Sequence, residues 1–112
     1  MKLYHRTVDQ AAAAILDQGF RDATGGYMTT HDHAGVWLSD MPLDANEGAV
    51  GDVLLEVILD VGDDVLGRYE WVEEGKRYRE FLVPAVVVNR HGTVRVVDGD
   101  EEDTIWLAGH DR

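Results

Sequence analysis

The sequence predicts an α+β fold in which one N-terminal helix precedes a mostly antiparallel sheet. Two observations carry this prediction. The clearest helical spacing of apolar residues lies near the N-terminus, between residues 8 and 19. After it come several short segments rich in valine, leucine, isoleucine and aromatic residues, separated by glycine, proline and acidic residues, which is typical of strands joined by turns.

The N-terminal part of the chain is expected to form a strand and then a helix. Residues 2–6 alternate as a strand does, with Leu3 and His5 on one face and Tyr4 on the other. Residues 8–19 follow as the helix, because alanines fill its body and apolar residues recur at spacings of three and four. The glycine at its end is the usual residue just past a helix C-terminus.

The rest of the chain is expected to supply strands and turns. The strand-like segments are residues 35–40, 52–59, 78–83, 86–88, 93–97 and, as a last short strand, 105–107. Residues 66–74 fit both a helix and a strand, and we expect an irregular turn leading into a short strand. Residues 21–34 have no periodicity and are expected to form a long loop. Residues 98–103 are expected to form an acidic loop.

Length and composition limit the class of protein. A chain of 112 residues fits a single domain, residues 1–112, and an apolar content of 45% is enough to build a core. Cysteine is absent, which excludes disulfides, zinc–thiolate sites and cysteine nucleophiles. The first residues lack the apolar region of a signal peptide, and no segment reaches the ~18 apolar residues of a membrane span. We therefore expect a cytoplasmic protein without a membrane partner.

The charge is strongly acidic, with a formal net charge of −12 at pH 7. Such a surface repels phosphate at long range, which disfavours bulk binding to nucleic acid. His31, Asp32 and His33 place two imidazoles close together, but no third ligand follows at a metal-binding spacing. We expect no metal site there.

Three short segments each place one polar or flat side chain on a predicted strand. They are His5 in Tyr-His-Arg-Thr, Trp37 in Gly-Val-Trp-Leu-Ser, and Glu80 in Tyr-Arg-Glu-Phe-Leu-Val. Each has an ordinary structural explanation: a half-buried histidine, a core tryptophan, and a surface glutamate paired with a neighbouring arginine. Their order along the chain, histidine then large aromatic residue then glutamate, is what indicates a function.

This ordered set resembles the His-Tyr-Glu signature of ADP-ribosyltransferases of the diphtheria-toxin and poly(ADP-ribose) polymerase type. Gly-Val-Trp-Leu-Ser is similar to the family's Gly-(Ile/Val)-Tyr-Phe-(Ala/Ser) block, and Glu-Phe-Leu-Val to its Glu-(Tyr/Phe)-(Leu/Ile)-Val block. The resemblance implies a minimal ADP-ribosyltransferase-like split antiparallel sheet with one N-terminal helix. It also implies an enzyme that uses NAD as co-substrate and cleaves its nicotinamide–ribose bond.

The first block implies how NAD would be anchored. His-Arg-Thr before a helix that ends in Gly-Phe is similar to the family's His-Gly-Thr block. By that resemblance His5 bonds the adenosine-side ribose hydroxyl, and the main chain of Arg6 bonds the nicotinamide amide. Thr7 belongs to the same NAD-binding block. Arg6 stands where the family usually has glycine, so its side chain must point away or contact the pyrophosphate.

The other two blocks imply the catalytic side of the site. Trp37 offers a flat face on which nicotinamide stacks. Ser39 lies on the same sheet face as Trp37 and would bond the nicotinamide amide or orient Glu80. Glu80 would stabilise the oxocarbenium-like ribose that forms as nicotinamide leaves. We expect His5, Trp37 and Glu80 to line one cleft on the face of the split sheet.

Two alternatives remain open. An RNA 2′-phosphotransferase-like enzyme shares the fold and the use of NAD, but it holds RNA phosphate with basic residues, which the net charge of −12 disfavours. A catalytically inactive NAD- or ADP-ribose-binding module, or a plain interaction domain, fits the departures at Arg6 and Trp37. The acceptor of ADP-ribose also stays open, since a protein, a nucleic acid or a small molecule is compatible with the sequence.

Overall fold

The computed structural model describes residues 1–25, 33–42, 51–72, 75, 77–101 and 105. Its elements in chain order are β1 (Lys2–Thr7), α1 (Asp9–Gln18), β2 (Ala23–Gly25), β3 (His33–Ser39), β4 (Val53–Leu59), α2 (Asp63–Leu66), η2 (Gly67–Tyr69), β5 (Glu70–Trp71), β6 (Glu80–Val83), α3 (Ala85–His91) and β7 (Gly92–Val97). The expected α+β class, with a helix after the first strand, is confirmed. Among the described residues, no helix is long and apolar enough to cross a membrane.

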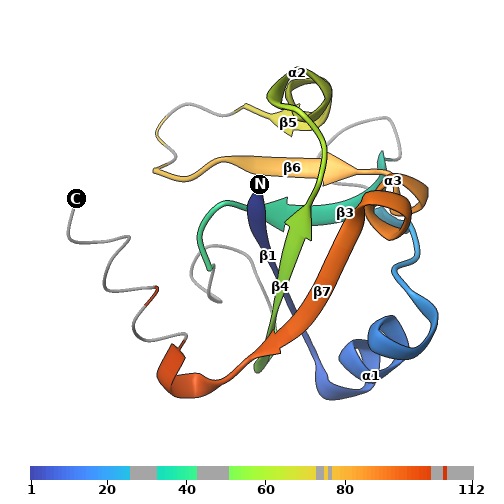
Figure 1. The fold of residues 1–112 in the computed structure, drawn as a ribbon, viewed down its shortest axis with the longest axis vertical. Helices are drawn as coiled ribbons and strands as arrows, with labels where there is room; N and C mark the ends of the chain where they lie inside the picture. The colour runs from blue at the N-terminus through green and yellow to red at the C-terminus, as the bar shows by residue number, and fades with distance from the viewer. Residues whose placement is uncertain (26–32, 43–50, 73–74, 76, 102–104, 106–112) are drawn as a thin grey trace.

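The strands form one sheet in the order β5-β6-β3-β1-β4-β7, and β2 adds to β3. The pairings among the described residues are antiparallel. The β1–β4 ladder runs from Lys2–Ile58 to Thr7–Val53, whereas β1 and β3 share the single registered pair Tyr4–Ser39. Figure 1 shows β3 and β6 running across the view while β1, β4 and β7 run steeply through it. The β1–β3 junction therefore has much less main-chain pairing than the β1–β4 ladder, although the strands belong to one sheet.

One face of the sheet, called here the helical face, carries the main core. Ala12 of α1, Leu66 of α2 and Val88 of α3 pack on this face, so α1, α2 and α3 each cover part of it. The strand residues of this core, all at most 3% exposed, are Leu3, Val36, Leu38, Leu55, Val57, Leu59, Phe81 and Val83. Burial of each such large side chain stabilises the fold by about 1.5–3 kcal/mol. His5 has the same strand parity as Leu3 and belongs to the helical face.

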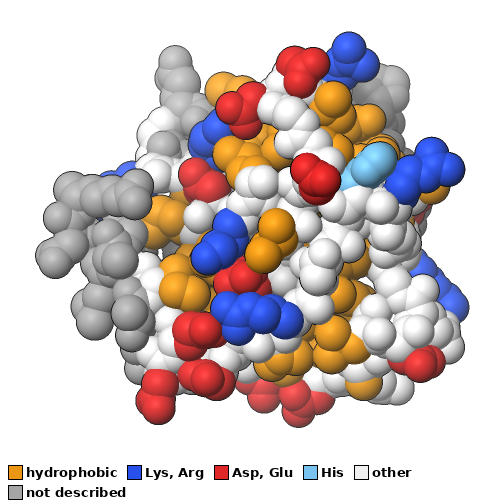
Figure 2. Space-filling view, in the orientation of Figure 1, with side chains coloured by type: hydrophobic (Ala, Val, Ile, Leu, Met, Phe, Trp, Pro, Cys, Tyr) orange, Lys and Arg blue, Asp and Glu red, His pale blue; other side chains and the backbone are white. Residues whose placement is uncertain are grey.

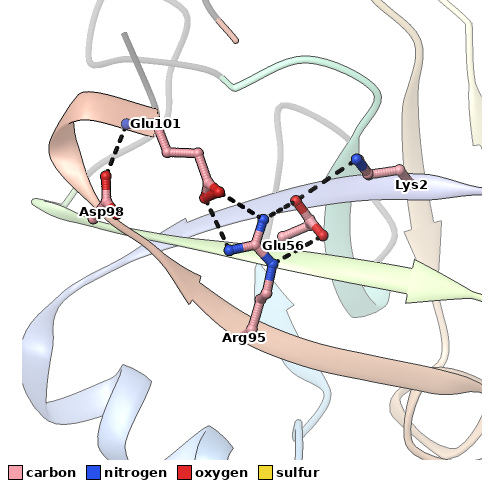
Figure 3. A network of polar contacts seen from close by, with 5 residues as sticks. All are labelled: Lys2, Glu56, Arg95, Asp98 and Glu101. Carbon is pink, nitrogen blue, oxygen red and sulfur yellow. Dashed lines mark hydrogen bonds and ion pairs between the residues drawn. The ribbon is translucent and has the colours of Figure 1, made fainter. Parts of the chain in front are cut away.

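The other side of the sheet, called here the opposite face, holds a buried carboxylate. Glu56 of β4 is 3% exposed, and its carboxylate accepts two hydrogen bonds from Arg95 of β7, at 3.2 and 2.8 Å. Arg95 also donates to Glu101, at 2.8 and 3.1 Å, and the Glu101 main-chain N–H donates to Asp98. Lys2 lies 4.0 Å from Glu56 (Figure 3). The network neutralises Glu56 and ties residues 98–101 to the sheet.

The prediction of a strand at residues 86–88 is wrong, because these residues lie in α3. Pro84 occupies the N-cap position, and its carbonyl accepts the N–H groups of Val87 and Val88 at 2.9 and 3.2 Å. Val88 is buried while Val86 is 67% exposed, which is the spacing of a helix with one packed side. Packing on the sheet outweighs the strand preference of the three valines.

Two loop predictions need correction. Residues 21–34 are not one loop, since β2 and the start of β3 lie within them and pair with each other. The acidic segment 98–103 contains a helical turn at residues 99–101, which begins after Asp98 accepts a main-chain N–H. A strand at 105–107 is also wrong at Ile105, which is helical, while residues 106–107 lie outside the described residues, as do His31 and Asp32.

Residues 66–72 agree with the irregular turn and short strand that the sequence predicts. They contain the end of α2, the 3-10 turn η2 and the two-residue strand β5. Residues 73–74 lie outside the described residues. The strand β5 pairs with β6 at the sheet edge, and this pairing brings Trp71 next to Glu80.

Candidate functional site

His5 bridges the junction between the two groups of strands. Its Nδ1 lies 2.8 Å from the main-chain carbonyl oxygen of Trp37, and its ring meets the edge of Phe20 at 5.4 Å and 88°. A carbonyl oxygen only accepts hydrogen bonds, so Nδ1 carries the proton and Nε2 keeps a free lone pair. Burial lowers the pKa of His5 from its ordinary value of 6.5, and the bond to Trp37 opposes this shift only in part. The ring is therefore a neutral imidazole whose Nε2 is an acceptor.

A cavity of about 490 Å³ opens beside this imidazole, between β1, α1 and β3. Apolar residues form most of its wall: Ala11, Ala14, Ile15, Phe20, Val36 and Trp37. Polar groups come from His5, Thr7, Gln18 and Arg21. Its volume falls within the roughly 300–1,000 Å³ of small-molecule sites, and a mainly apolar wall with a few polar groups is their usual composition. We call it the His5 cavity.

Trp37 links the His5 cavity to the opposite face. Its strand position is opposite Leu82, one residue out of step with the core residues Val36 and Leu38. Its ring meets that of Trp71 at 5.5 Å and 77°, an edge-to-face contact. The sequence gives no indication of this contact, because Trp71 lies in a segment whose pattern fits both a helix and a strand. The contact holds the Trp37 ring against Trp71 on the opposite face.

Glu80 lies between two neighbours on the opposite face. It is directly opposite Ser39 on β3 and directly opposite Trp71 on β5. Side chains at such paired positions lie on the same face with Cβ atoms about 4.5–5.5 Å apart. Glu80 is half-buried in this position. The carboxylate is thus placed beside an aromatic ring on a paired strand.

Ser39 uses its hydroxyl proton elsewhere. Its Oγ donates to the carbonyl oxygen of Met41 at 2.6 Å, and the carbonyl oxygen of Tyr4 is more distant, at 3.5 Å. Ser39 is 4% exposed. In this arrangement the hydroxyl stabilises the end of β3 and does not donate to Glu80, which corrects the expectation that it orients the carboxylate.

Asp40 and Arg79 fix the position at which β6 begins. The Asp40 N–H donates to the Arg79 carbonyl at 3.0 Å, and the Arg79 N–H donates to the Asp40 carboxylate at 2.8 Å. The Arg79 guanidinium pairs with Glu70, at 2.8 and 3.3 Å, and this bond lowers the pKa of Glu70. The Arg79 guanidinium is thus held by Glu70 of β5. The main-chain contacts with Asp40 set the strand register that places Glu80.

The structure brings some of the predicted site residues together and separates others. His5, Thr7 and Trp37 all line the His5 cavity. Arg6 alternates with His5 along β1, so its side chain lies on the opposite face and does not line this cavity. Ser39 and Glu80 also lie outside the cavity wall, on the opposite face. The expectation that His5, Trp37 and Glu80 line one cleft is therefore wrong for Glu80, because strand alternation places it on the other side of the sheet from His5.

The candidate site therefore has two parts that meet at Trp37. The His5 cavity lies on the helical side of the β1–β3 junction, and the Glu80 carboxylate lies beyond Trp37 and Trp71. Trp37 is common to both parts, since it lines the cavity and its ring meets that of Trp71. A ligand that uses both parts must extend past the Trp37 ring.

The surface charge gives no continuous basic tract on the face shown in Figure 2. Basic side chains lie there in several separate groups with acidic side chains among them. Comparisons with models of protein families, with curated proteins and with solved structures found no match.

Proposed function

We propose that the protein is an NAD-dependent ADP-ribosyltransferase-like enzyme that cleaves the nicotinamide–ribose bond and transfers ADP-ribose to an acceptor. The observation that carries this proposal is the neutral imidazole of His5, whose Nε2 is an acceptor beside a mainly apolar cavity that Trp37 also lines. The resemblance of the three sequence blocks points to the same residues.

The His5 cavity suits the adenosine end of NAD. Its apolar wall, which includes Phe20 and Ala14, offers a surface for the adenine ring. A ribose hydroxyl donates to Nε2 of His5, which is an acceptor because the neutral ring carries its proton on Nδ1. Arg21 lines the same cavity and donates to Gln18 at 3.2 Å, so a guanidinium is available for the negatively charged diphosphate.

Trp37 supplies the surface for nicotinamide. Trp71 meets Trp37 edge to face, so it supports the Trp37 ring without stacking parallel to it. A planar nicotinamide ring stacks on an aromatic face of this kind, and the contact contributes about 1 kcal/mol beyond the buried area. Bound there, nicotinamide leads the ribose toward Glu80, the cross-strand neighbour of Trp71.

Glu80 acts in the bond-breaking step. The bond between ribose C1′ and the nicotinamide nitrogen breaks, its electron pair leaves with neutral nicotinamide, and the ribose becomes oxocarbenium-like. A carboxylate that accepts a hydrogen bond from the ribose 2′-hydroxyl stabilises this positive charge. An acceptor atom then forms the new bond to C1′ and loses its proton. Glu80 is proposed as the catalytic residue, and Ser39 beside it supports the strand.

The test of this proposal is NAD binding followed by nicotinamide release. We expect calorimetry to show NAD binding that His5→Gln weakens, and chromatography to show nicotinamide released by the unaltered protein. His91→Gln is a matched control, because His91 lies exposed at the end of α3. A folded His5→Gln protein that binds NAD as tightly as His91→Gln does would overturn the placement of NAD.

One observation favours a second candidate, a catalytically inactive NAD- or ADP-ribose-binding module. Glu80 lies outside the wall of the His5 cavity, so binding there does not by itself require the carboxylate. The two functions differ in one result. The module binds NAD or ADP-ribose in the cavity and releases no nicotinamide, whereas the enzyme does both.

A further inference from the structure

The side-chain amide of Asn89 makes two hydrogen bonds to the main chain of Phe20. The Phe20 N–H donates to Oδ1 of Asn89 at 2.8 Å, and Nδ2 of Asn89 donates to the Phe20 carbonyl at 2.9 Å. The amide thus replaces a strand partner for a residue that belongs to no strand. A third long-range bond lies close by, from the Ala85 N–H to the Asp22 carboxylate at 2.8 Å. Helix α3 therefore fixes the segment that follows α1.

Gly19 makes room for this arrangement. A Cβ atom on Gly19 would lie 2.9 Å from Oδ1 and 3.1 Å from Cγ of Asn89, and Gly19 has φ +88°. An ordinary side chain here would both strain the backbone and push the amide away. The glycine that ends α1 is thus also the residue over which Asn89 reaches Phe20.

Phe20 transmits this restraint to His5. Its side chain is 6% exposed and meets the His5 ring at 5.4 Å, nearly perpendicular to it. We propose that Asn89 is a positioning residue which, through Phe20, holds the His5 imidazole against the Trp37 carbonyl with its acceptor nitrogen toward the cavity. The use of that nitrogen for a ribose hydroxyl rests on the proposed function, but the positioning does not.

The environment of His5 makes the effect measurable. Phe20 covers the ring and Trp37 holds Nδ1, while Arg21 is the charged group that, among the described residues, shares the cavity wall with it. Loss of the Phe20 restraint admits water, and hydration raises the pKa of a buried imidazole toward its ordinary value of 6.5. The Nδ1 proton then exchanges faster, because its carbonyl partner is no longer fixed.

The experiment is an NMR titration of the His5 ring in the full chain. Asn89→Ala removes both bonds to Phe20, and Asn89→Asp keeps the acceptor but loses the donor. Val86→Ala is the matched control, because Val86 lies on the same helix and is 67% exposed. We expect the pKa of His5 to rise in Asn89→Ala, to rise less in Asn89→Asp, and to stay unchanged in Val86→Ala. NAD affinity should fall by about three- to tenfold in Asn89→Ala, the scale of one or two hydrogen bonds.

The outcomes separate the positioning role of Asn89 from the proposed use of NAD. An unchanged pKa and an unchanged Nδ1–H signal in either folded Asn89 variant would overturn the positioning role. If Asn89→Ala does not fold, Asn89→Asp with Val86→Ala still gives the comparison. A shifted His5 pKa in a protein that binds no NAD would leave Asn89 as the positioning residue and would reject the proposed function instead.

Discussion

The imidazole of His5 donates to the main-chain carbonyl of Trp37 at 2.8 Å across the junction between β1 and β3. The two strands share a single registered pair, Tyr4–Ser39, so a side chain holds them where main-chain pairing ends. His5 and Trp37 both line the cavity beside this junction. The proposed chemistry depends on this arrangement.

The first prediction concerns stability and pH. Because the pKa of His5 is lowered in the folded protein, the unfolded chain takes up a proton at a higher pH than the folded protein does. This contribution to stability is therefore complete above the unfolded pKa near 6.5 and declines as the pH falls toward the lower folded pKa. Melting temperatures between about pH 8 and about pH 5 should fall less steeply in His5→Gln than in the unaltered protein. Parallel curves for the two proteins would contradict the burial of a neutral ring.

The second prediction concerns stacking by Trp37. Trp37→Ala removes the aromatic face and should weaken NAD binding by about 1 kcal/mol or somewhat more, while Trp37→Tyr should largely restore it. Calorimetry on folded protein gives both values. Equal NAD affinity in the unaltered protein and in Trp37→Ala would count decisively against stacking.

The third prediction concerns the close packing of Gly51 against the main chain of Thr7, at the end of β1. Gly51 has φ +127°, and a Cβ atom there would overlap the main-chain carbonyl of Thr7, a residue of the His5 cavity. Gly51→Ala should therefore lower the free energy of unfolding by more than about 1 kcal/mol. Gly67→Ala is the control, since nothing lies within 4 Å of a Cβ atom at Gly67. Denaturant unfolding that gives similar losses for both variants would be inconsistent with this packing.

The fourth prediction concerns the buried carboxylate of Glu56. Arg95→Ala leaves Glu56, which is 3% exposed, with Lys2 at 4.0 Å as its remaining charged neighbour in the network of Figure 3. Glu101→Gln removes a charge only from the exposed end of that network. Thermal melting should show a clearly larger loss for Arg95→Ala, because an uncompensated buried charge is costly. The reverse order would mean that Glu101, and not Glu56, needs Arg95.

The sequence predicts the fold class well because its strongest patterns are local. The alternation at Leu3, Tyr4 and His5 and the apolar residues of β4 give strand and face directly. The valines at 86–88 predict a strand where the structure has a helix. Their preference for strands is overridden by Pro84 at the helix start and by the burial of Val88. A pattern of valines does not show which surface will cover them.

The candidate site is predicted only in part, because its decisive contacts involve main-chain groups far away in the sequence. His5 bonds a carbonyl 32 residues further along, and Asn89 bonds the main chain of Phe20, 69 residues away. Trp71 reaches its place through the pairing of a two-residue strand, which composition does not reveal. Ser39 follows the expected face, but the turn carbonyl of Met41 takes its hydroxyl proton.

The central claim, that Glu80 stabilises the ribosyl cation, is tested most directly by single-turnover nicotinamide release from labelled NAD. Glu80→Gln keeps the shape of the side chain and removes its charge, so it affects the transition state more than the bound ground state. We expect NAD affinity to stay within a few-fold and release to fall by roughly 100-fold or more. Thermal melting controls for folding. Unchanged release by a well-folded Glu80→Gln protein would contradict the account, and Glu80 would then be a structural residue of β6.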